Sequence, residues 1–279
     1  MDSLPTHPQP LELKDSPLPD VVDFCDVTKR FGDKLVLDRI TFKVADIPKK
    51  GELVAIVGTS GCGKSTLAKI IAGIAPHFPQ SEGSAVAFGK PIEGPSIDRG
   101  VVDQRYSLLP HLTVLDNIAF GLRLAGMKKR DRHNRAREWI GRIGLEGSEA
   151  KYPHELSGGM QQRVAIASTL ILKPRIVLMD EPFGALDPKI RVQMQDLLIE
   201  LWEAQASTIF FITHSAEEAV YLGDRVFRMS SNPGRIVEKL EFGRPDRKLA
   251  DMRQDKRFAE HVAYLLLKLE DRTAGAEEK

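Results

Sequence analysis

The chain has 279 residues, 42% of them hydrophobic and 28% charged, which is typical of a globular protein with a substantial core. Lys and Arg number 40 against 39 Asp and Glu, so no overall basic field favours nucleic acid. The longest apolar runs fall far short of the roughly 18 residues that a membrane-spanning helix needs. With no signal-peptide pattern, and with Cys25 and Cys62 as its two cysteines, the chain is expected in a reducing cytosol unless a partner holds it at a membrane.

The first third of the chain alternates between strand and helix patterns. Residues 1–20 contain five prolines and predict a flexible leader. Segments 21–27 and 35–44 alternate in polarity and predict two strands around a turn. The apolar run 53–57 predicts a buried parallel strand, and 66–73 predicts the helix that follows it. Residues 76–95 are rich in Pro, Gly and Ser and predict an irregular hairpin region.

The rest of the chain contains a helical block and then returns to alternation. Helices are predicted at 114–124, 132–143, 160–172 and 189–204, buried strands at 176–179 and 208–213, and late strands at 226–229 and 236–240. Residues 241–279 form a charged tail with a helix at 258–269. The helical block, about 111–164, interrupts an alternating pattern, which predicts an α/β protein with a parallel-sheet core and an inserted α-helical subdomain.

A phosphate loop follows the first buried strand. The sequence fits the pattern G-x-x-x-x-G-K-[ST], in which glycines let several backbone N–H groups point at a phosphate. Lys64 would place a charge near the β- and γ-phosphates, Ser65 would offer its hydroxyl to Mg²⁺, and Thr66 would bond the α-phosphate. The helix dipole could also lower the pKa of Cys62 and make it reactive. The predicted ATP site consists of Gly58, Thr59, Ser60, Gly61, Cys62, Gly63, Lys64, Ser65 and Thr66.

Two carboxylates end the second buried strand. In open α/β sheets, the carboxyl ends of strands face the ligand crevice. Asp180 is therefore predicted to hold Mg²⁺ through its water shell, and Glu181 to act as general base toward the attacking water. An ordinary acidic turn is the alternative, which the presence of the phosphate loop makes less favoured.

Residues 157–163 read Ser-Gly-Gly-Met-Gln-Gln-Arg and lie between the phosphate loop and the acidic pair. This order resembles the ATPase subunit of ATP-binding cassette (ABC) transporters over about residues 21–240. The resemblance implies a P-loop NTPase (RecA-like) core with an antiparallel β subdomain and the helical insertion. It also implies an ATPase domain at 21–240, between the leader and the tail 241–279.

The resemblance further implies a site shared between two copies of the chain. Ser157, Gly158 and Gly159 would face the γ-phosphate of ATP held by the other protomer in a head-to-tail homodimer. Asp187, which closes the Ala-Leu-Asp loop, would couple the two sites. His214 would contact the γ-phosphate.

Two other positions carry less defined roles in the resemblance. Gln104 would bind Mg²⁺ and sense the γ-phosphate, although Asp103 stands where the family often has Phe. Phe31 would stack on adenine, and a core phenylalanine at a strand end is the equally weighted alternative.

Shorter stretches at 108–118, 152–156, 181–187 and 232–236 are similar to nitrate, sulfonate and taurine importers. This likeness implies ATP hydrolysis on the cytoplasmic face of the inner membrane, a permease, a separate solute-binding protein and a small anionic cargo. The alternative is a soluble ABC ATPase acting on DNA or ribosomes, which usually carries two cassettes or coiled-coil arms. A small-molecule kinase would leave residues 157–163 unexplained.

Overall fold

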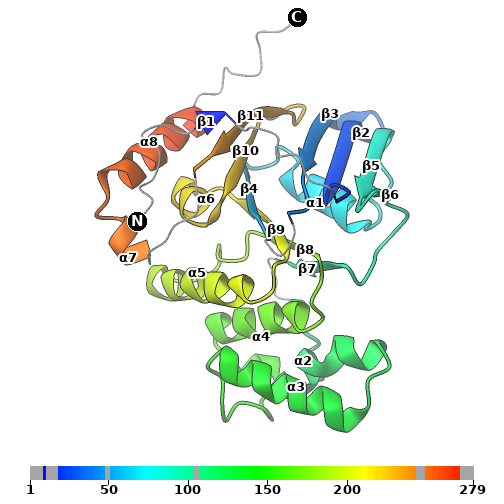
Figure 1. Ribbon diagram of the computed structural model, residues 1–279, viewed down its shortest axis with the longest axis vertical. Coiled ribbons are helices and arrows are strands. Elements are labelled where there is room, and N and C mark those ends of the chain that lie inside the picture. Colours follow the sequence, from blue (N-terminus) through cyan, green and yellow to red (C-terminus); the bar gives the residue numbers. More distant parts are fainter. Residues whose placement is uncertain (1–8, 11–17, 48–50, 104–106, 243–248, 271–279) are drawn as a thin grey trace, which may run out of the picture. The chain divides into compact units, whose positions relative to one another are not determined.

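The computed structural model describes residues 9–10, 18–47, 51–103, 107–242 and 249–270 (Figure 1). The chain divides into two compact units, each described separately below. The first unit comprises Met1–Ser96 and Thr208–Lys279, and the second comprises Ile97–Ser207.

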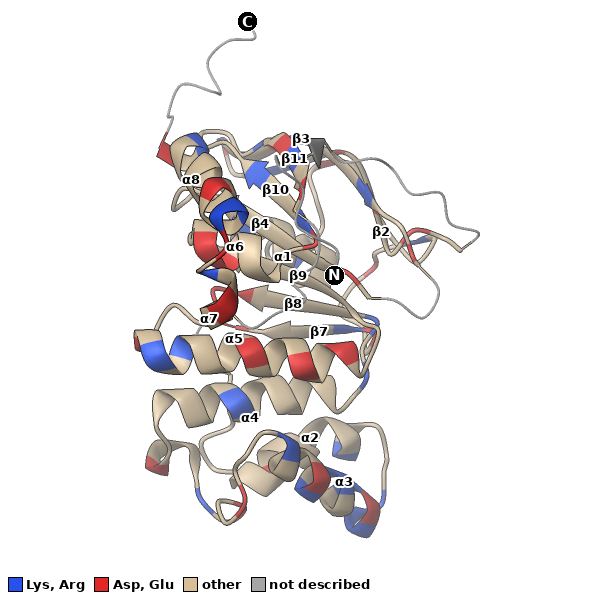
Figure 2. Ribbon diagram, turned by 60° about the vertical axis from the view of Figure 1, so that its left-hand side comes forward, with Lys and Arg blue, Asp and Glu red and all other residues tan. Residues whose placement is uncertain are grey.

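A largely parallel sheet forms the centre of the first unit. Its strands run in the order β1 (Gln9–Pro10), β11 (Ile236–Glu241), β10 (Arg225–Met229), β4 (Leu53–Gly58) and β9 (Thr208–Thr213). Strand β4 pairs in parallel with both β9 and β10, and every residue of β4 and β9 is buried. Figure 2 shows both strands free of charged residues. Continuous apolar runs are what a strand buried on both faces requires.

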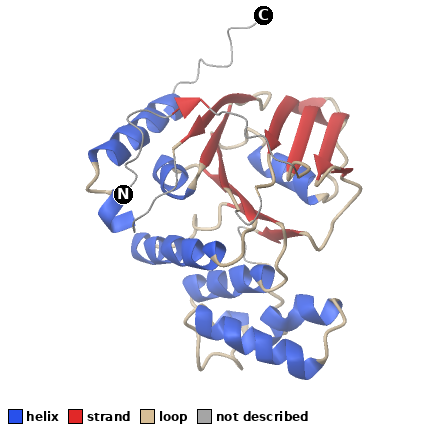
Figure 3. Ribbon diagram, in the orientation of Figure 1, coloured by secondary structure: helices blue, strands red, loops and turns tan. Residues whose placement is uncertain are grey.

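A second, antiparallel sheet completes the strands of this unit (Figure 3). Its order is β3 (Lys34–Val44), β2 (Val22–Phe31), β5 (Glu82–Ala87) and β6 (Lys90–Pro91). The rings of Phe24 on β2 and Phe42 on β3 lie 5.1 Å apart on its buried face. The predicted irregular hairpin region therefore contains a regular antiparallel pair, β5 and β6.

The helices of the first unit are α1 (Lys64–Ala72), α6 (Ala216–Leu222), α7 (Leu249–Met252) and α8 (Lys256–Glu270). Helix α8 packs on α6 and buries Phe258, His261 and Leu265. The Tyr264 hydroxyl donates to Glu238 Oε1 on β11 at 2.6 Å, and burial together with this carboxylate raises the pKa of Tyr264 to about 12. The helix predicted in the tail therefore docks on its own unit.

The second unit combines a strand pair with helices. Strands β7 (Arg99–Val102) and β8 (Ile176–Asp180) pair in parallel. Helices α2 (Val114–Leu124), α3 (Lys129–Arg142) and α4 (Gly158–Leu170) lie between them in the sequence, with a short 3₁₀ turn at Pro153–Glu155, and α5 (Pro188–Glu203) follows β8. Helix α2 packs on both α3 and α4, which buries the apolar faces of the inserted helices.

These elements confirm the predicted α/β class, the antiparallel β subdomain and the inserted helices. The sequence did not predict β7, α6, α7 or β1, and β1 places Gln9–Pro10 of the leader against β11. The domain boundaries at 20, 111, 164 and 240 stay predictions. Within the described residues, no helix combines the length and apolar character that crossing a membrane requires.

Candidate nucleotide site

The phosphate loop joins β4 to α1 and presents exposed backbone at its tip. Thr59, Ser60 and Gly61 are exposed, whereas Cys62 and Lys64 are buried. Helix α1 begins directly at the loop, and its first backbone N–H groups have no partner earlier in the helix. A loop of exposed N–H groups that leads into a helix N-terminus is an anion site.

Lys64 is fixed by the loop that it follows. Its Nζ donates to the carbonyl oxygens of Gly58 at 2.8 Å and Thr59 at 3.0 Å, and only 5% of the residue is exposed. An ammonium group has three donor directions, and the carbonyls take two of them. The third faces only the weak acceptor Cys62 Sγ at 3.9 Å, so a phosphate oxygen can compete for it. The loop thus holds a cation at the anion site before any nucleotide binds.

Gly63 is one of the loop positions that a residue with a side chain fits poorly. Its φ is +98°, in the left-handed region, and a Cβ there would lie 2.6 Å from Leu37 Cδ2 on β3. Both the backbone angle and the contact with β3 therefore require glycine. This explains physically why the phosphate-loop pattern has a glycine just before its lysine.

Cys62 differs from its sequence-based expectation. Burial raises the pKa of its thiol, and the nearby Lys64 ammonium, with Nζ 3.9 Å from Sγ, opposes this shift without reversing it. The thiol is only 1% exposed. The hypothesis of a low-pKa reactive thiol is wrong, because desolvation outweighs the helix dipole and the neighbouring charge.

Alkylation kinetics can check this correction with a control inside the same chain. At pH 8, iodoacetamide is expected to modify Cys62 at least about tenfold more slowly than the exposed Cys25, because Cys62 is both covered and less ionised. Mass spectrometry of quenched time points measures both rates. Equal rates in the folded protein would contradict the buried, protonated thiol.

Phe31 ends β2 and is half-buried, outside the fully buried core. Its ring meets the edge of His77 at 5.3 Å, and Lys29 Nζ lies 5.0 Å from the ring centroid. Burial lowers the pKa of Lys29, and burial with the charges of Lys69 and Lys29 lowers the pKa of His77. The partly accessible ring is compatible with stacking on adenine, which stays a prediction.

His214 follows β9 and is exposed. The turn that carries it is bonded on both sides: Ser215 N donates to Thr213 Oγ1 at 3.0 Å, and Ser215 Oγ accepts from Glu218 N at 3.3 Å. Ser215 is the N-cap of α6. The sequence analysis missed Thr213 and Glu218, although Ser-x-x-Glu before a helix is a capping-box signal.

In the second unit, Asp180 and Glu181 are both partly exposed at the end of β8. Glu181 has a φ of +46°, which is uncommon for a residue with a side chain, and Gly184 N donates to its carbonyl oxygen at 3.2 Å. Unusual backbone conformations of this kind are concentrated at functional positions.

The other predicted residues of this unit are at helix starts. Ser157 caps α4 by accepting from Met160 N at 3.4 Å, and Asp187 caps α5 by accepting from Ile190 N at 3.1 Å. A Cβ at Gly159 would lie 2.6 Å from Ile190 Cγ2, so glycine allows α4 and α5 to approach at this point. Gln104 lies outside the described residues.

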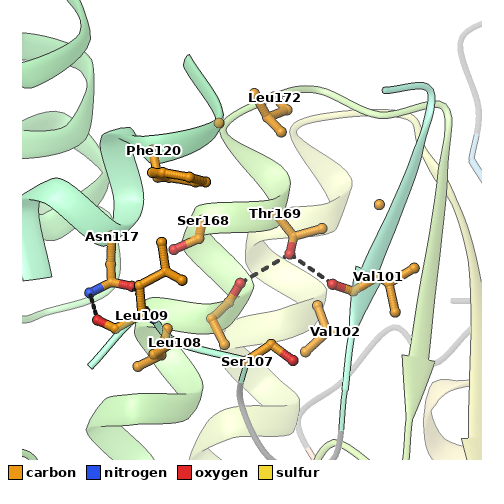
Figure 4. Close-up of a pocket in the computed structure, with 13 residues that line it drawn as sticks. Val101, Val102, Ser107, Leu108, Leu109, Asn117, Phe120, Ser168, Thr169 and Leu172 are labelled. Atoms are coloured by element: carbon orange, nitrogen blue, oxygen red, sulfur yellow. Dashed lines mark hydrogen bonds between the residues drawn. The ribbon is translucent and has the colours of Figure 1, made fainter. Parts of the chain in front are cut away.

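A pocket of about 250 Å³ opens in the second unit beside the segment 107–109 (Figure 4). Its polar lining atoms already have partners: Thr169 Oγ1 donates to the carbonyl oxygens of Val101 and Ala165, and Asn117 bonds both backbone groups of Leu109. The pocket therefore presents a surface that is more apolar than polar to any occupant. It is lined by Gly100, Val101, Val102, Ser107, Leu108, Leu109, Asn117, Phe120, Gly121, Ala165, Ser168, Thr169 and Leu172.

Comparison with known proteins gives consistent matches. Residues 37–184 match the ABC transporter family, a range that includes the phosphate loop, Ser157–Gly159 and the acidic pair. The taurine import ATP-binding protein TauB of Rhizobium johnstonii is 48% identical over 256 residues, covering 88% of this chain and 95% of that protein. An uncharacterized ABC transporter ATP-binding protein of Methanocaldococcus jannaschii is 50% identical over 211 residues, covering 75% and 76% respectively.

A solved structure matches over a similar extent. It is cbiO1 from Clostridium perfringens, described as part of the ABC transporter complex cbiONQ. The superposition has a TM-score of 0.68 at 25% sequence identity and covers 90% of this chain and 97% of that one. The similarity therefore extends beyond the motifs to nearly the whole length of both chains.

Proposed function

The chain belongs to the ABC transporter family, and we propose that it is the ATPase subunit of a bacterial importer of a small anion such as taurine, another sulfonate or nitrate. Its enzymatic activity is ATP hydrolysis coupled to transport. The observation that carries the cargo proposal is the similarity to a taurine import ATP-binding protein over nearly the full length of both chains.

In the proposed reaction, water attacks the γ-phosphate, and ADP and phosphate leave. Lys64, held at the loop carbonyls, offsets negative charge on the β- and γ-phosphates. Glu181 orients the attacking water and accepts its proton. His214, exposed at the end of β9, holds the γ-phosphate. The chemistry is thus positioning and charge compensation, with Phe31 stacking on adenine.

We infer that Ser65, Asp180 and Gln104 provide the ligands for Mg²⁺. A hydroxyl, a carboxylate and an amide oxygen are hard donors that suit this ion. Among the residues that the structure describes, no three His, Cys, Asp or Glu side chains gather as a metal cage. Mg²⁺ keeps water and phosphate oxygens as its other ligands and, when bound, would offset the phosphate charge.

We propose that the working form is a head-to-tail homodimer. Ser157 and Gly158 are exposed at the start of α4, where N–H groups and the helix dipole favour an anion. The phosphate loop of the same chain already cradles its own nucleotide, so this second anion site fits ATP held by the other protomer. Asp187, at the start of α5, then couples the two nucleotide sites.

The proposed partners are a permease and a separate solute-binding protein, with this chain on the cytoplasmic face of the inner membrane. The pocket beside residues 107–109 supports a permease contact, because its apolar lining suits an apolar segment of another chain. Residues 107–109, which line this pocket, follow Gln104 closely in the sequence. Permease contact and nucleotide sensing would therefore share one segment.

The alternative, a soluble ABC ATPase acting on DNA or ribosomes, has no support among the relatives named above. The net charge of +1 provides no general basic field for nucleic acid. We therefore propose no nucleic-acid partner.

An uptake assay tests the proposed function. Cells lacking this chain would receive the wild type or the Glu181→Gln variant. Initial uptake of labelled taurine would be measured with and without excess unlabelled alkanesulfonate or nitrate, and uptake of labelled nitrate would be measured in parallel. We expect only the wild type to restore uptake, with sulfonates competing. Restored nitrate uptake alone would change the proposed cargo. No restored anion uptake, together with ATP turnover stimulated by nucleic acid, would overturn the importer assignment.

A further inference from the structure

A relay of hydrogen bonds holds the turn that carries His214. Thr213 Oγ1 accepts from Ser215 N at 3.0 Å and donates to Glu218 Oε2 at 2.5 Å. The same glutamate gives its backbone N–H to Ser215 Oγ at 3.3 Å. These bonds form a closed loop that begins and ends on Glu218. The loop passes through Thr213 and Ser215, the two neighbours of His214 in the chain.

The ring is a capping box with one added member. In a simple capping box, the carboxylate at the third helical position reaches back to the N–H of the capping residue. Here the Thr213 hydroxyl stands between them, so the carboxylate acts on Ser215 N through Thr213. Because Thr213 and Ser215 flank His214, the relay fixes the backbone on both sides of the histidine.

Burial gives the relay its strength. Thr213 is 2% exposed and Glu218 is 8% exposed, so water competes little for these atoms. An O–H···O⁻ bond at such a length is charge-assisted and stronger than a neutral one. Losing one member would leave a buried donor or acceptor unpaired, which costs more than the bond itself contributes.

Helix α6 supplies a rigid support for Glu218. Five of its seven residues are at most 2% exposed, namely Ala216, Ala219, Val220, Tyr221 and Leu222. The helix packs on β4, β9 and α8 (Figure 1). The neighbouring Glu217 has another role, since both of its carboxylate oxygens accept from Arg253, at 2.6 and 2.8 Å. The Glu218 side chain, by contrast, connects the packed helix to the His214 turn through Thr213.

We propose that Glu218 is a positioning residue for ATP hydrolysis, acting through Thr213 on the placement of His214. This inference rests on the proposed role of His214 at the γ-phosphate. Glu218 orients the turn, and the imidazole is then placed toward the phosphate without rearrangement during the reaction. Small displacements of a catalytic group can lower turnover by about 100-fold.

Two substitutions act on different members of the relay. Thr213→Val removes the hydroxyl with little change of shape. Glu218→Gln replaces the charged acceptor with a neutral amide oxygen, which accepts from the Thr213 hydroxyl more weakly. We expect each to lower kcat about 10- to 100-fold while the Kd of a fluorescent ATP analogue changes less than about threefold. Thr213→Ser keeps the hydroxyl and should retain most activity. Glu217→Gln is the matched control, with the same chemical change one residue away, and should retain wild-type kcat.

A double-mutant cycle separates positioning from a general structural effect. His214→Ala alone should lower kcat strongly, and adding Thr213→Val or Glu218→Gln to it should lower kcat by less than about twofold further, because the relay acts through the histidine. Additive losses would overturn the proposal, as would full activity of both relay variants beside an inactive His214→Ala. An active His214→Ala would instead contradict the proposed role of His214. Thermal melts identify any variant that fails to fold, and the Thr213→Val and Thr213→Ser pair then decides.

Discussion

Replacing Lys64 with alanine is expected to lower ATP turnover at least about 100-fold, a rise of about 2.7 kcal/mol in the activation free energy. It is also expected to weaken ATP binding. The ammonium group is bonded to two loop carbonyls and is nearly inaccessible, so no other side chain of the loop can replace it. Its loss removes the one lysine charge that the loop holds at the anion site and leaves the carbonyls of Gly58 and Thr59 without this donor. Phosphate release and titration with a fluorescent ATP analogue measure the two effects.

A control for the Lys64 variant is available in helix α1. Lys69→Ala removes a lysine from the last turn of α1, where it has no contact with the loop carbonyls, and should change turnover less than about twofold. Lys64→Arg keeps the charge, but a planar guanidinium has to fit where the lysine is 5% exposed, so activity should stay low. Wild-type turnover by Lys64→Ala would contradict the assignment of this loop as the ATP site.

Most of the fold could be predicted because its elements have strong local signals. The runs that become β4, β8 and β9 are almost entirely apolar, with Asp180 ending β8 and threonines at both ends of β9, and the buried strand is the arrangement that such runs favour. The helices of the inserted block carry polar and apolar faces or clear N-cap residues, such as Thr113 before α2. Element identity therefore followed from the sequence, with ends shifted by a few residues.

The missed elements are short and gain their stability from tertiary contacts. Strand β7 has only the four residues Arg99–Val102, and it is held by pairing with β8. Helix α6 has seven residues, too few to be stable alone in water, and it exists because its apolar face packs on the sheet. Local sequence patterns contain little information about such elements.

The site could be predicted as a set of residues but not in its geometry. No sequence signal gives Glu181 its positive φ, because residues other than glycine rarely adopt it. The direction of the Cys62 pKa shift was also wrong, because the helix dipole is visible in the sequence whereas burial under neighbouring side chains is not. The Ser-x-x-Glu spacing distinguishes Glu218 from the adjacent Glu217 in the sequence, but the burial of Glu218 and the pairing of Glu217 with Arg253 are visible only in the structure.

A second large loss of ATP turnover is expected when Glu181 is replaced, and the same variant tests the proposed dimer. Glu181→Gln should lower kcat about 100- to 10,000-fold, because an amide cannot accept the proton of the attacking water. ATP should stay bound, since the phosphate loop and Lys64 are unchanged. If protomers close around two ATP molecules, the trapped state should be a stable dimer, detectable by size-exclusion chromatography with light scattering, with Mg²⁺ omitted or added. Glu138→Gln, at an exposed position of α3, should behave as the wild type in both assays.

Adding a substitution at Ser157 tests whether the nucleotide site is shared. Ser157 is exposed at the start of α4, so Ser157→Arg places a long side chain where the partner's ATP is proposed to contact this chain. It also removes the bond from Met160 N, a loss of about 1 kcal/mol that Ser157→Ala reproduces without the bulk. In the Glu181→Gln background, we expect Ser157→Ala to keep the ATP-dependent dimer and Ser157→Arg to abolish it while ATP still binds. A dimer that persists with Ser157→Arg would place the start of α4 outside the nucleotide interface and would contradict the head-to-tail arrangement.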